Sequence, residues 1–365
     1  MNNQTKVRWS SQFTFMMAAV GSAVGLANIY RFPYTAGVSG GGAFVLIYLG
    51  AVLLLALPLV IAELTVGRRG KAAPPQAIRN VAAESGLSSR WGWMGVILGG
   101  LGGMLALSFY SVVGGWTMAF TVEMATGAAG GTAEQARNVF GQLNANPWAV
   151  LGWFTLFIGA TIVISSRGIR GGIERAVKLM MPALLVILVL MVGYAMSVGE
   201  FQRAVDFLFK PDFSKVDASV FLAAAGQAFF SVSVGLTALV AYGSYIRRDT
   251  SIPRSALVIV SVDTLVALLA GLAIFPIIFA FGVEPDAGPG LVFITLPIVF
   301  AGMPGGEFFG TVFFLLLLFA ALTSSIGMLE APVSWLAERT RLGRTGAAFA
   351  AGGVSWCLGI LAALS

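Results

Sequence analysis

The 365-residue sequence has little charge, no histidine and a single cysteine. Charged residues make up 10% of the chain, whereas soluble domains usually contain about a quarter. Without histidine the chain has neither a Ser-His-Asp triad nor an imidazole metal site, and no two acids are spaced for catalysis. Cys357 alone permits neither an internal disulfide nor a CxxC pair. The sequence is therefore not predicted to be an enzyme.

Apolar residues are abundant instead. They make up 58% of the chain, and apolar runs of about 20 residues recur along its whole length, as in all-α polytopic membrane proteins. The first run is too long for the apolar part of a cleavable signal, so it is predicted to span the membrane. The run 291–303 is shorter and is predicted as a short helix in an outer loop. We predict one domain, 1–365, with nine spans near 12–36, 42–67, 92–126, 148–165, 173–197, 219–246, 254–282, 306–340 and 344–364.

The net charge of +6 is explained by topology rather than by a nucleic-acid partner. Most of the 22 lysines and arginines lie in loops that alternate assignment places on one side of the membrane. The positive-inside rule then places the N-terminus in the cytoplasm and, after nine spans, the C-terminus outside.

The first span is interrupted near its middle. Glycines, a serine and an asparagine occupy 21–28, and Pro33 follows. Glycine weakens a helix and proline removes a backbone donor, so this span is predicted to break at the bilayer centre. Its free carbonyls and amides must then face protein or a polar cavity, where carbonyls hold cations and amides hold anions.

A second interruption lies in the span 219–246, where serine and glycine again occupy the middle of the membrane. Both interruptions contain Val-Gly-Leu, at 24–26 and 234–236. Broken segments at corresponding places in two halves of a chain point to a transporter site between two repeats. A three-residue match of such common residues also arises by chance, so the match alone leaves the repeat open.

Several polar residues lie inside other predicted spans. Asp263 is deep enough to need a cation or a donor beside it, although solvation through a loop is the alternative. Thr323 and Ser324 offer oxygens to a hard cation, but such hydroxyls also bond back to their own helix. Tyr110 lies about 18 residues into its span, where its hydroxyl is a candidate substrate donor. Glu330 lies near the inner end of its span, where ion pairs that close the inner side are expected.

Together these motifs resemble the neurotransmitter:sodium symporter family, in its bacterial amino-acid-transporting branch. The resemblance rests on Trp9, on the run 21–33 (GSAVGLANIYRFP) and on the run 40–44 (GGGAF). It implies a fold of inverted five-plus-five helix repeats, with helices 1 and 6 broken. The first repeat would cover about 12–197. The second, about 219–364, would be incomplete because the family core needs a tenth helix.

The resemblance also implies which residues bind. Two sodium sites would use carbonyl, amide, carboxyl or hydroxyl groups of Gly21, Ala23, Val24, Asn28, Ser231, Asp263, Ala320, Thr323 and Ser324. The substrate would contact Ala23, Gly25, Leu26, Ala27, Tyr110, Phe230, Ser231, Ser233, Leu236 and Met328. The outer gate would use Arg31, the inner gate Lys6, Trp9, Tyr245 and Glu338, and helix 5 would unwind between Gly172 and Pro182.

The implied activity is sodium-driven import of a small neutral, hydrophobic or aromatic amino acid across a bacterial inner (cell) membrane. Two Na⁺ ions are expected, and chloride is not, because Asp263 supplies a fixed negative charge where relatives often have a neutral residue. The lipid bilayer is the expected environment and no nucleic acid is expected; the residues do not define an oligomeric state. The alternative is a non-transporting membrane subunit or sensor that keeps the fold, since a chain without the tenth helix is either a fragment or a truncated variant.

Overall fold

The computed structural model describes residues 8–129, 133–247, 249–282 and 290–364. Within these ranges the regular elements are all helical, which confirms the all-α class, and Gly41 and Pro211 form one isolated antiparallel bridge. The α-helices are α1 (Gln12–Ala23), α2 (Phe32–Val38), α3 (Gly42–Ala51), α4 (Leu57–Gly70), α5 (Pro74–Glu84), α6 (Gly92–Met94), α7 (Gly103–Ala125), α8 (Ala133–Ala145), α9 (Pro147–Ser166), α10 (Glu174–Val198), α11 (Phe201–Phe209), α12 (Ala218–Ser231), α13 (Ala238–Ser244), α14 (Ile252–Ala280), α15 (Leu296–Ala301), α16 (Gly306–Arg339) and α17 (Gly343–Ala363).

Shorter 3₁₀- or π-helical segments adjoin several of these helices. Five are π-helical, and a π-turn leaves the usual backbone ladder irregular, often near functional sites. They are η1 (Ala27–Arg31), η2 (Val52–Ala56), η4 (Gly95–Gly102), η5 (Ile169–Ile173) and η7 (Leu291–Thr295), with 3₁₀ turns at η3 (Ser89–Trp91) and η6 (Phe213–Lys215).

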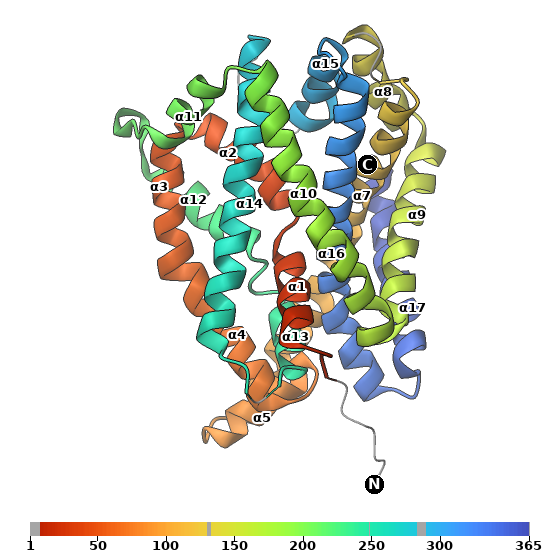
Figure 1. Cartoon of the computed structure of the whole chain (residues 1–365). Coiled ribbons are helices and arrows are strands. Elements are labelled where there is room, and N and C mark those ends of the chain that lie inside the picture. Colours follow the sequence, from red (N-terminus) through yellow and green to blue (C-terminus); the bar gives the residue numbers. More distant parts are fainter. Residues whose placement is uncertain (1–7, 130–132, 248, 283–289, 365) are drawn as a thin grey trace.

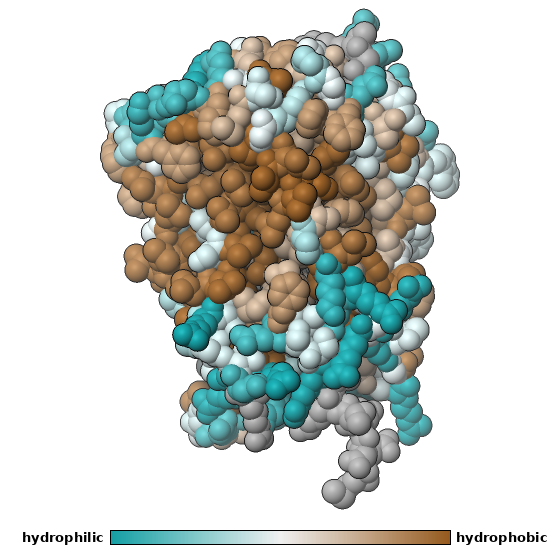
Figure 2. All heavy atoms as spheres, viewed as in Figure 1, coloured by the Kyte–Doolittle hydropathy of each residue, from teal (hydrophilic) through white to brown (hydrophobic). Residues whose placement is uncertain are grey.

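The molecule has the surface of a membrane protein. Among the described residues, seven helices are long and apolar enough to cross a bilayer, and an eighth span results if one bent pair is counted. That pair consists of α1 and the helix Ala27–Val38, which meet at an angle of 48°. Figure 2 shows a broad hydrophobic band around the middle of the visible face, with hydrophilic residues gathered below and above it. The long helices run through this band (Figure 1).

The predicted sixth span, 219–246, is not established by helix length. It consists of α12, with 14 residues, and α13, with seven, separated by the helix-free segment 232–237. The count of nine spans therefore stays a prediction. The run 291–303 is helical, as η7 followed by α15.

Three further helices were not predicted from the sequence. They are α5, near the lower end of the molecule in Figure 1, and α8 and α11, near the upper end. Each is short and amphipathic, so it lacks the long apolar run that identified the spans. For example, α11 buries Ala204 and Leu208 while its charged residues remain exposed.

The helix α16 forms the centre of the packing. It is 34 residues long, and 78% of its most apolar window is buried inside the protein. It packs against α7, α10, α17 and α1, so the broken first span lies beside it. This approach requires Gly327, because a Cβ there would overlap the side chain of Ser22 in α1. The central position of α16 brings its polar residues to the break in α1.

Candidate functional site

The break after α1 is closed by the side chain of Asn28 together with one backbone hydrogen bond. Val24 leaves the helical conformation at φ −64° and ψ 113°, and the helical pattern resumes in η1. The amide of Gly25 donates to Asn28 Oδ1 at 3.0 Å, and the amide of Asn28 donates to the carbonyl of Gly25 at 3.1 Å. Asn28 therefore holds the two halves of the interrupted span together at the depth where lipid offers no partner.

The other end of the Asn28 side chain joins two further helices. Its Nδ2 donates to Ser231 Oγ in α12 at 2.9 Å and to Asp263 Oδ1 in α14 at 2.8 Å. Ser231 Oγ donates in turn to Asp263 Oδ2 at 2.5 Å. All three side chains are fully buried. This group, the Asn28 cluster, places an amide, a hydroxyl and a carboxylate at one point where both interrupted spans meet.

A second group of oxygens lies on the other side of the α1 break. Ser324 Oγ in α16 donates to the carbonyl of Val24 at 3.0 Å and lies 3.5 Å from that of Gly21. One residue earlier, Thr323 Oγ1 lies 3.1 Å from the carbonyl of Ala320. Carbonyl and hydroxyl oxygens are the ligands that hard cations prefer. Both groups thus offer the oxygen ligands that Na⁺ requires, and the Asn28 cluster also carries the negative charge of Asp263.

A cavity of about 300 Å³ lies beside the α1 break, and Ser324 of the second group is one of its lining residues. None of its lining side chains is charged, and most are apolar. Tyr110 forms one wall, where its hydroxyl accepts a hydrogen bond from the amide of Leu26 at 3.2 Å. The lining residues are Ala23, Gly25, Ala27, Ala106, Phe109, Tyr110, Gly226, Phe229, Phe230, Ser233, Val234, Leu236, Ser324 and Met328.

The cavity floor is the segment 232–237 between α12 and α13. Ser233 Oγ lies 3.4 Å from the carbonyl of Ser22, which ties this floor to α1. The amide of Gly235 donates to Glu63 Oε1 of α4 at 2.6 Å. Glu63 thus accepts a hydrogen bond from the free backbone of the second interruption, as Asn28 does at the first.

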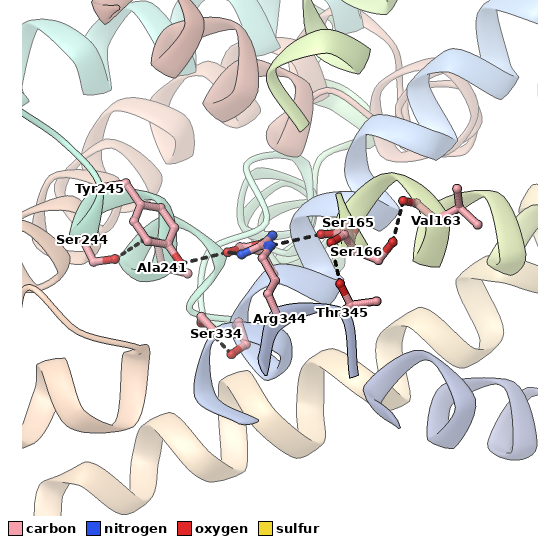
Figure 3. A network of polar contacts seen from close by, with 11 residues as sticks. Val163, Ser165, Ser166, Ala241, Ser244, Tyr245, Ser334, Arg344 and Thr345 are labelled. Atoms are coloured by element: carbon pink, nitrogen blue, oxygen red, sulfur yellow. Dashed lines mark hydrogen bonds and ion pairs between the residues drawn. The ribbon is translucent and has the colours of Figure 1, made fainter. Parts of the chain in front are cut away.

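Near the N-terminal end of the described chain, Trp9 packs on the end of α13. Its Nε1 donates to the carbonyl of Tyr242 at 3.1 Å, and its ring meets that of Tyr242 edge-on. The Tyr245 hydroxyl donates to Glu330 at 2.9 Å, and Arg344 donates to both oxygens of the same carboxylate, at 3.0 and 2.6 Å. Figure 3 shows Tyr245 on one side of Arg344 and Ser165, whose carbonyl accepts from Arg344 Nε at 3.1 Å, on the other. Four helices are joined in this way.

Beyond the α1 break, the guanidinium of Arg31 lies over the ring of Phe230, 4.7 Å from its centroid. This cation–π contact sits at the edge of the cavity, which Phe230 lines. In the part of the chain that the structure describes, no acid forms an ion pair with Arg31.

The structure gathers most of the residues singled out in the sequence. Eight of the ten substrate candidates line the cavity; Leu26 contacts Tyr110 from behind it, and Ser231 belongs to the Asn28 cluster. Gly172 lies in η5, against the carbonyl of Ile164, and Pro182 lies within α10. Lys6 falls outside the described residues. Glu338 accepts from the amide of Ala73, at the start of α5, and forms no hydrogen bond with Tyr245.

Sequence reasoning missed the role of one acid. Glu63 was not singled out, although an acid inside a predicted span is itself a signal of function. Glu330 forms an ion pair as expected, but its partner Arg344 was not named, because it lies 14 residues further on, at the start of the next helix. Of the cavity wall, Ala106, Phe109, Gly226, Phe229 and Val234 carry no signal that separates them from lipid-facing residues.

An interrupted membrane span with carbonyl and hydroxyl oxygens at its break, beside a small cavity, is the arrangement of a secondary-transporter binding site. The chain belongs to the sodium:neurotransmitter symporter family, whose model matches residues 6–131 and 138–361. This confirms the resemblance noted in the sequence. The family transports solutes with sodium, so the protein is a sodium-dependent membrane transporter and not an enzyme.

Individual proteins that are similar in sequence or structure support this family assignment. The chain is 38% identical to the uncharacterized sodium-dependent transporter YhdH of Bacillus subtilis, over all of this chain and 80% of YhdH. It is 35% identical to an uncharacterized sodium-dependent transporter of Haemophilus influenzae, over 94% of this chain and 76% of that protein. Among solved structures, that of MhsT in complex with L-phenylalanine is similar, with a TM-score of 0.90 and 40% identity over 98% of this chain and 81% of MhsT.

Proposed function

We propose that the protein imports a neutral hydrophobic or aromatic amino acid together with Na⁺. The observation that carries this proposal is the cavity, which is lined without a charged side chain and lies at the α1 break, where the two oxygen groups also contact the chain. MhsT, with 40% identity, was solved with L-phenylalanine. The uncharged wall matches an apolar side chain, while the substrate carboxylate would meet the amides near Leu26 and Ala27 and the Tyr110 hydroxyl.

The two oxygen groups are proposed as two sodium sites. The Asn28 cluster, with the carbonyl of Ala23, would hold the ion nearer the substrate carboxylate. The group around Ser324 would hold the other. A bound Na⁺ would supply the positive charge that orders the interrupted helices. The side chains of the two oxygen groups would hold the ion there.

Transport would proceed by alternating access between inverted repeats, with the protein in a bacterial inner membrane and its N-terminus in the cytoplasm. Arg31 would close the outer side, and Trp9 and Tyr245 the inner side. Two sodium ions moving down roughly 100 mV contribute about 4.6 kcal/mol. At about 1.4 kcal/mol per tenfold, this supports a substrate gradient of more than a thousandfold.

Transport is expected to be independent of chloride. Both oxygens of Asp263 accept hydrogen bonds at the Asn28 cluster, so a carboxylate already supplies the negative charge there. Uptake of labelled phenylalanine into proteoliposomes should run equally fast in sodium chloride and sodium gluconate. Strict dependence on chloride would remove this part of the proposal.

Replacing Gly25 with alanine should weaken sodium-dependent phenylalanine binding by at least about tenfold. A Cβ at this position would overlap Ser324 Oγ and lie 2.9 Å from the Tyr110 hydroxyl. It would therefore crowd both the oxygen group around Ser324 and the cavity. Gly159→Ala in α9 is the matched control, because nothing lies within 4 Å of its added carbon. Equal affinities in the two variants, measured by equilibrium binding, would place the substrate elsewhere.

The experiment that tests the proposed function is a thermal-shift screen of the twenty amino acids, each with sodium and with potassium. Neutral hydrophobic or aromatic amino acids should raise the unfolding temperature only when sodium is present. Stabilisation by charged amino acids instead would overturn the substrate class. Binding with sodium but no uptake into proteoliposomes would favour a sensor that keeps the fold.

A further inference from the structure

A second hollow lies at the protein surface, between the end of α4 and the end of α5. Its volume is about 410 Å³, and it shares no lining residue with the substrate cavity. Only charged residues line it: Arg68, Arg69, Lys71 and Glu84. Three cations and one carboxylate give this basic hollow a formal net charge of +2. Its chemistry therefore suits an anion.

The basic hollow adjoins a helix surface that faces lipid. The span Gly42–Gly70, which contains α4, is apolar enough to cross a bilayer, yet only 33% of its most apolar window is buried inside the protein. On α4, Leu59 and Ala62 are exposed. Arg69 lies seven residues beyond Ala62, which is two helical turns along the same face. The lipid-facing stripe of α4 therefore ends in the basic hollow.

Two exposed tryptophans indicate the depth of this region in the membrane. Trp91 and Trp93 are exposed, and the segments that carry them, η3 and α6, pack against α5. Tryptophan is enriched at the boundary between the apolar bilayer core and the lipid headgroups. The helix α5 lies near the lower end of the molecule (Figure 1), where Figure 2 shows hydrophilic residues below the apolar band. The basic hollow is therefore at the depth of the lipid headgroups.

Contacts from three segments hold the hollow in shape. Arg68 Nη1 donates to the carbonyl of Thr250, in the loop before α14, at 2.7 Å. Arg69 Nη2 pairs with Glu84 Oε2, at the end of α5, at 3.1 Å. Gly70 lies so close to the backbone of α5 that a Cβ there would overlap it. The end of α4 is thus fixed to α5 and to the loop before α14.

Lys71 is the unusual residue of the hollow. It ends α4 in the left-handed conformation, at φ 50° and ψ 37°, where glycine is the usual residue. Its amide donates to the carbonyl of Gly67 at 2.9 Å, a contact that a glycine would make as well. Its ammonium forms no ion pair with any described acid. What lysine adds at this position is therefore its positive charge.

Cations are favourable at any helix C-terminus, so charge alone does not make a site. Here the cations line a hollow at headgroup depth, at the foot of a lipid-facing stripe. We propose that the basic hollow binds the phosphate of an anionic phospholipid whose acyl chains lie along α4. Arg68 and Arg69 offer planar donor groups to phosphate oxygens, and Lys71 adds a point charge. This site is separate from the proposed amino-acid site and does not depend on it.

The test is thermal unfolding of the purified protein in detergent, titrated with phosphatidylglycerol. The unfolding temperature should rise saturably, and the midpoint of the rise gives an apparent dissociation constant. Phosphatidylcholine with the same acyl chains should stabilise wild type and variants alike, because it carries no net charge. Inorganic phosphate at the same concentrations should leave the unfolding temperature unchanged, because it cannot contact the α4 stripe.

Two variants should change the affinity for phosphatidylglycerol in opposite directions. Lys71→Gly should weaken it by about fivefold, the contribution of one cation beside an anionic lipid. Because glycine favours the left-handed conformation of this position, this variant keeps the fold. Glu84→Gln should strengthen binding by about fivefold, because it removes the only carboxylate of the hollow and releases Arg69.

Arg90→Gln is the matched control, because Arg90 belongs to η3 beside α5 but does not line the hollow. Its affinity should equal that of wild type. Equal weakening by Lys71→Gly and Arg90→Gln would overturn the site, since only total charge would then matter. The proposal also fails if Glu84→Gln weakens binding, if phosphatidylcholine binds as phosphatidylglycerol does, or if inorganic phosphate gives the same stabilisation. The last result would indicate a soluble anion instead of a lipid.

Discussion

Replacing Asn28 with alanine is expected to reduce sodium-dependent amino-acid binding by at least about a hundredfold. The change removes the acceptor of the Gly25 amide and the donor to Ser231 and Asp263, all of them buried. Each buried polar group left without a partner costs about 1–3 kcal/mol, and the interrupted span loses its closing contact. The measurement is binding of labelled phenylalanine against sodium concentration.

Asn144→Ala is the matched control, because Asn144 is exposed and, among the described residues, its side chain bonds to the carbonyl of Phe140 in its own helix. This variant should bind as wild type does. An Asn28→Ala protein that is folded and binds with unchanged sodium dependence would show that the Asn28 cluster is not a sodium site.

The second large effect is expected on stability. Arg344→Gln should lower the free energy of unfolding by about 3–5 kcal/mol, because it leaves the carboxylate of Glu330 buried without its cation. Glu330 is fully buried and the Arg344 side chain is 24% exposed, so solvent screens the pair only in part. The lost bonds also join α17 to α16, α9 and, through Tyr245, α13. Unfolding in detergent, followed by tryptophan fluorescence or circular dichroism, measures the loss.

Two comparisons make this result specific. Arg203→Gln breaks an exposed pair with Glu200 and should change stability by less than about 1 kcal/mol. Replacing both Glu330 and Arg344 with apolar residues should restore much of the stability, because no charge is then stranded. Similar small losses for Arg344→Gln and Arg203→Gln would contradict the assigned contribution of the buried pair.

The interrupted spans could be predicted because their cause is local. Glycine, serine and asparagine in the middle of an apolar run, with Pro33 beyond it, weaken the helix by themselves. The family resemblance then named the candidate oxygen groups. Of these, Asn28, Ser231 and Asp263 lie together in the structure, and Ser324 lies against the carbonyl of Val24.

Pairing between distant residues could not be predicted in the same way. Glu338 was expected to belong to the same gate as Tyr245, and that role stays a prediction. In the structure Glu338 accepts from the amide of Ala73 at the start of α5, which packs against α4. Tyr245 donates to Glu330, which lies about two turns earlier along α16. The left-handed backbone of the segment 232–237 and the π-helical segment η4 were not predicted either, because neither has a sequence pattern of its own.

The central claim is that sodium entry through the interrupted spans drives amino-acid uptake, and proteoliposomes with an imposed sodium gradient test it most directly. Labelled phenylalanine should accumulate above its external concentration when sodium is high outside, and more so with a negative interior. It should only equilibrate or stay outside when potassium replaces sodium on both sides. Accumulation of the same size without a sodium gradient would contradict the account.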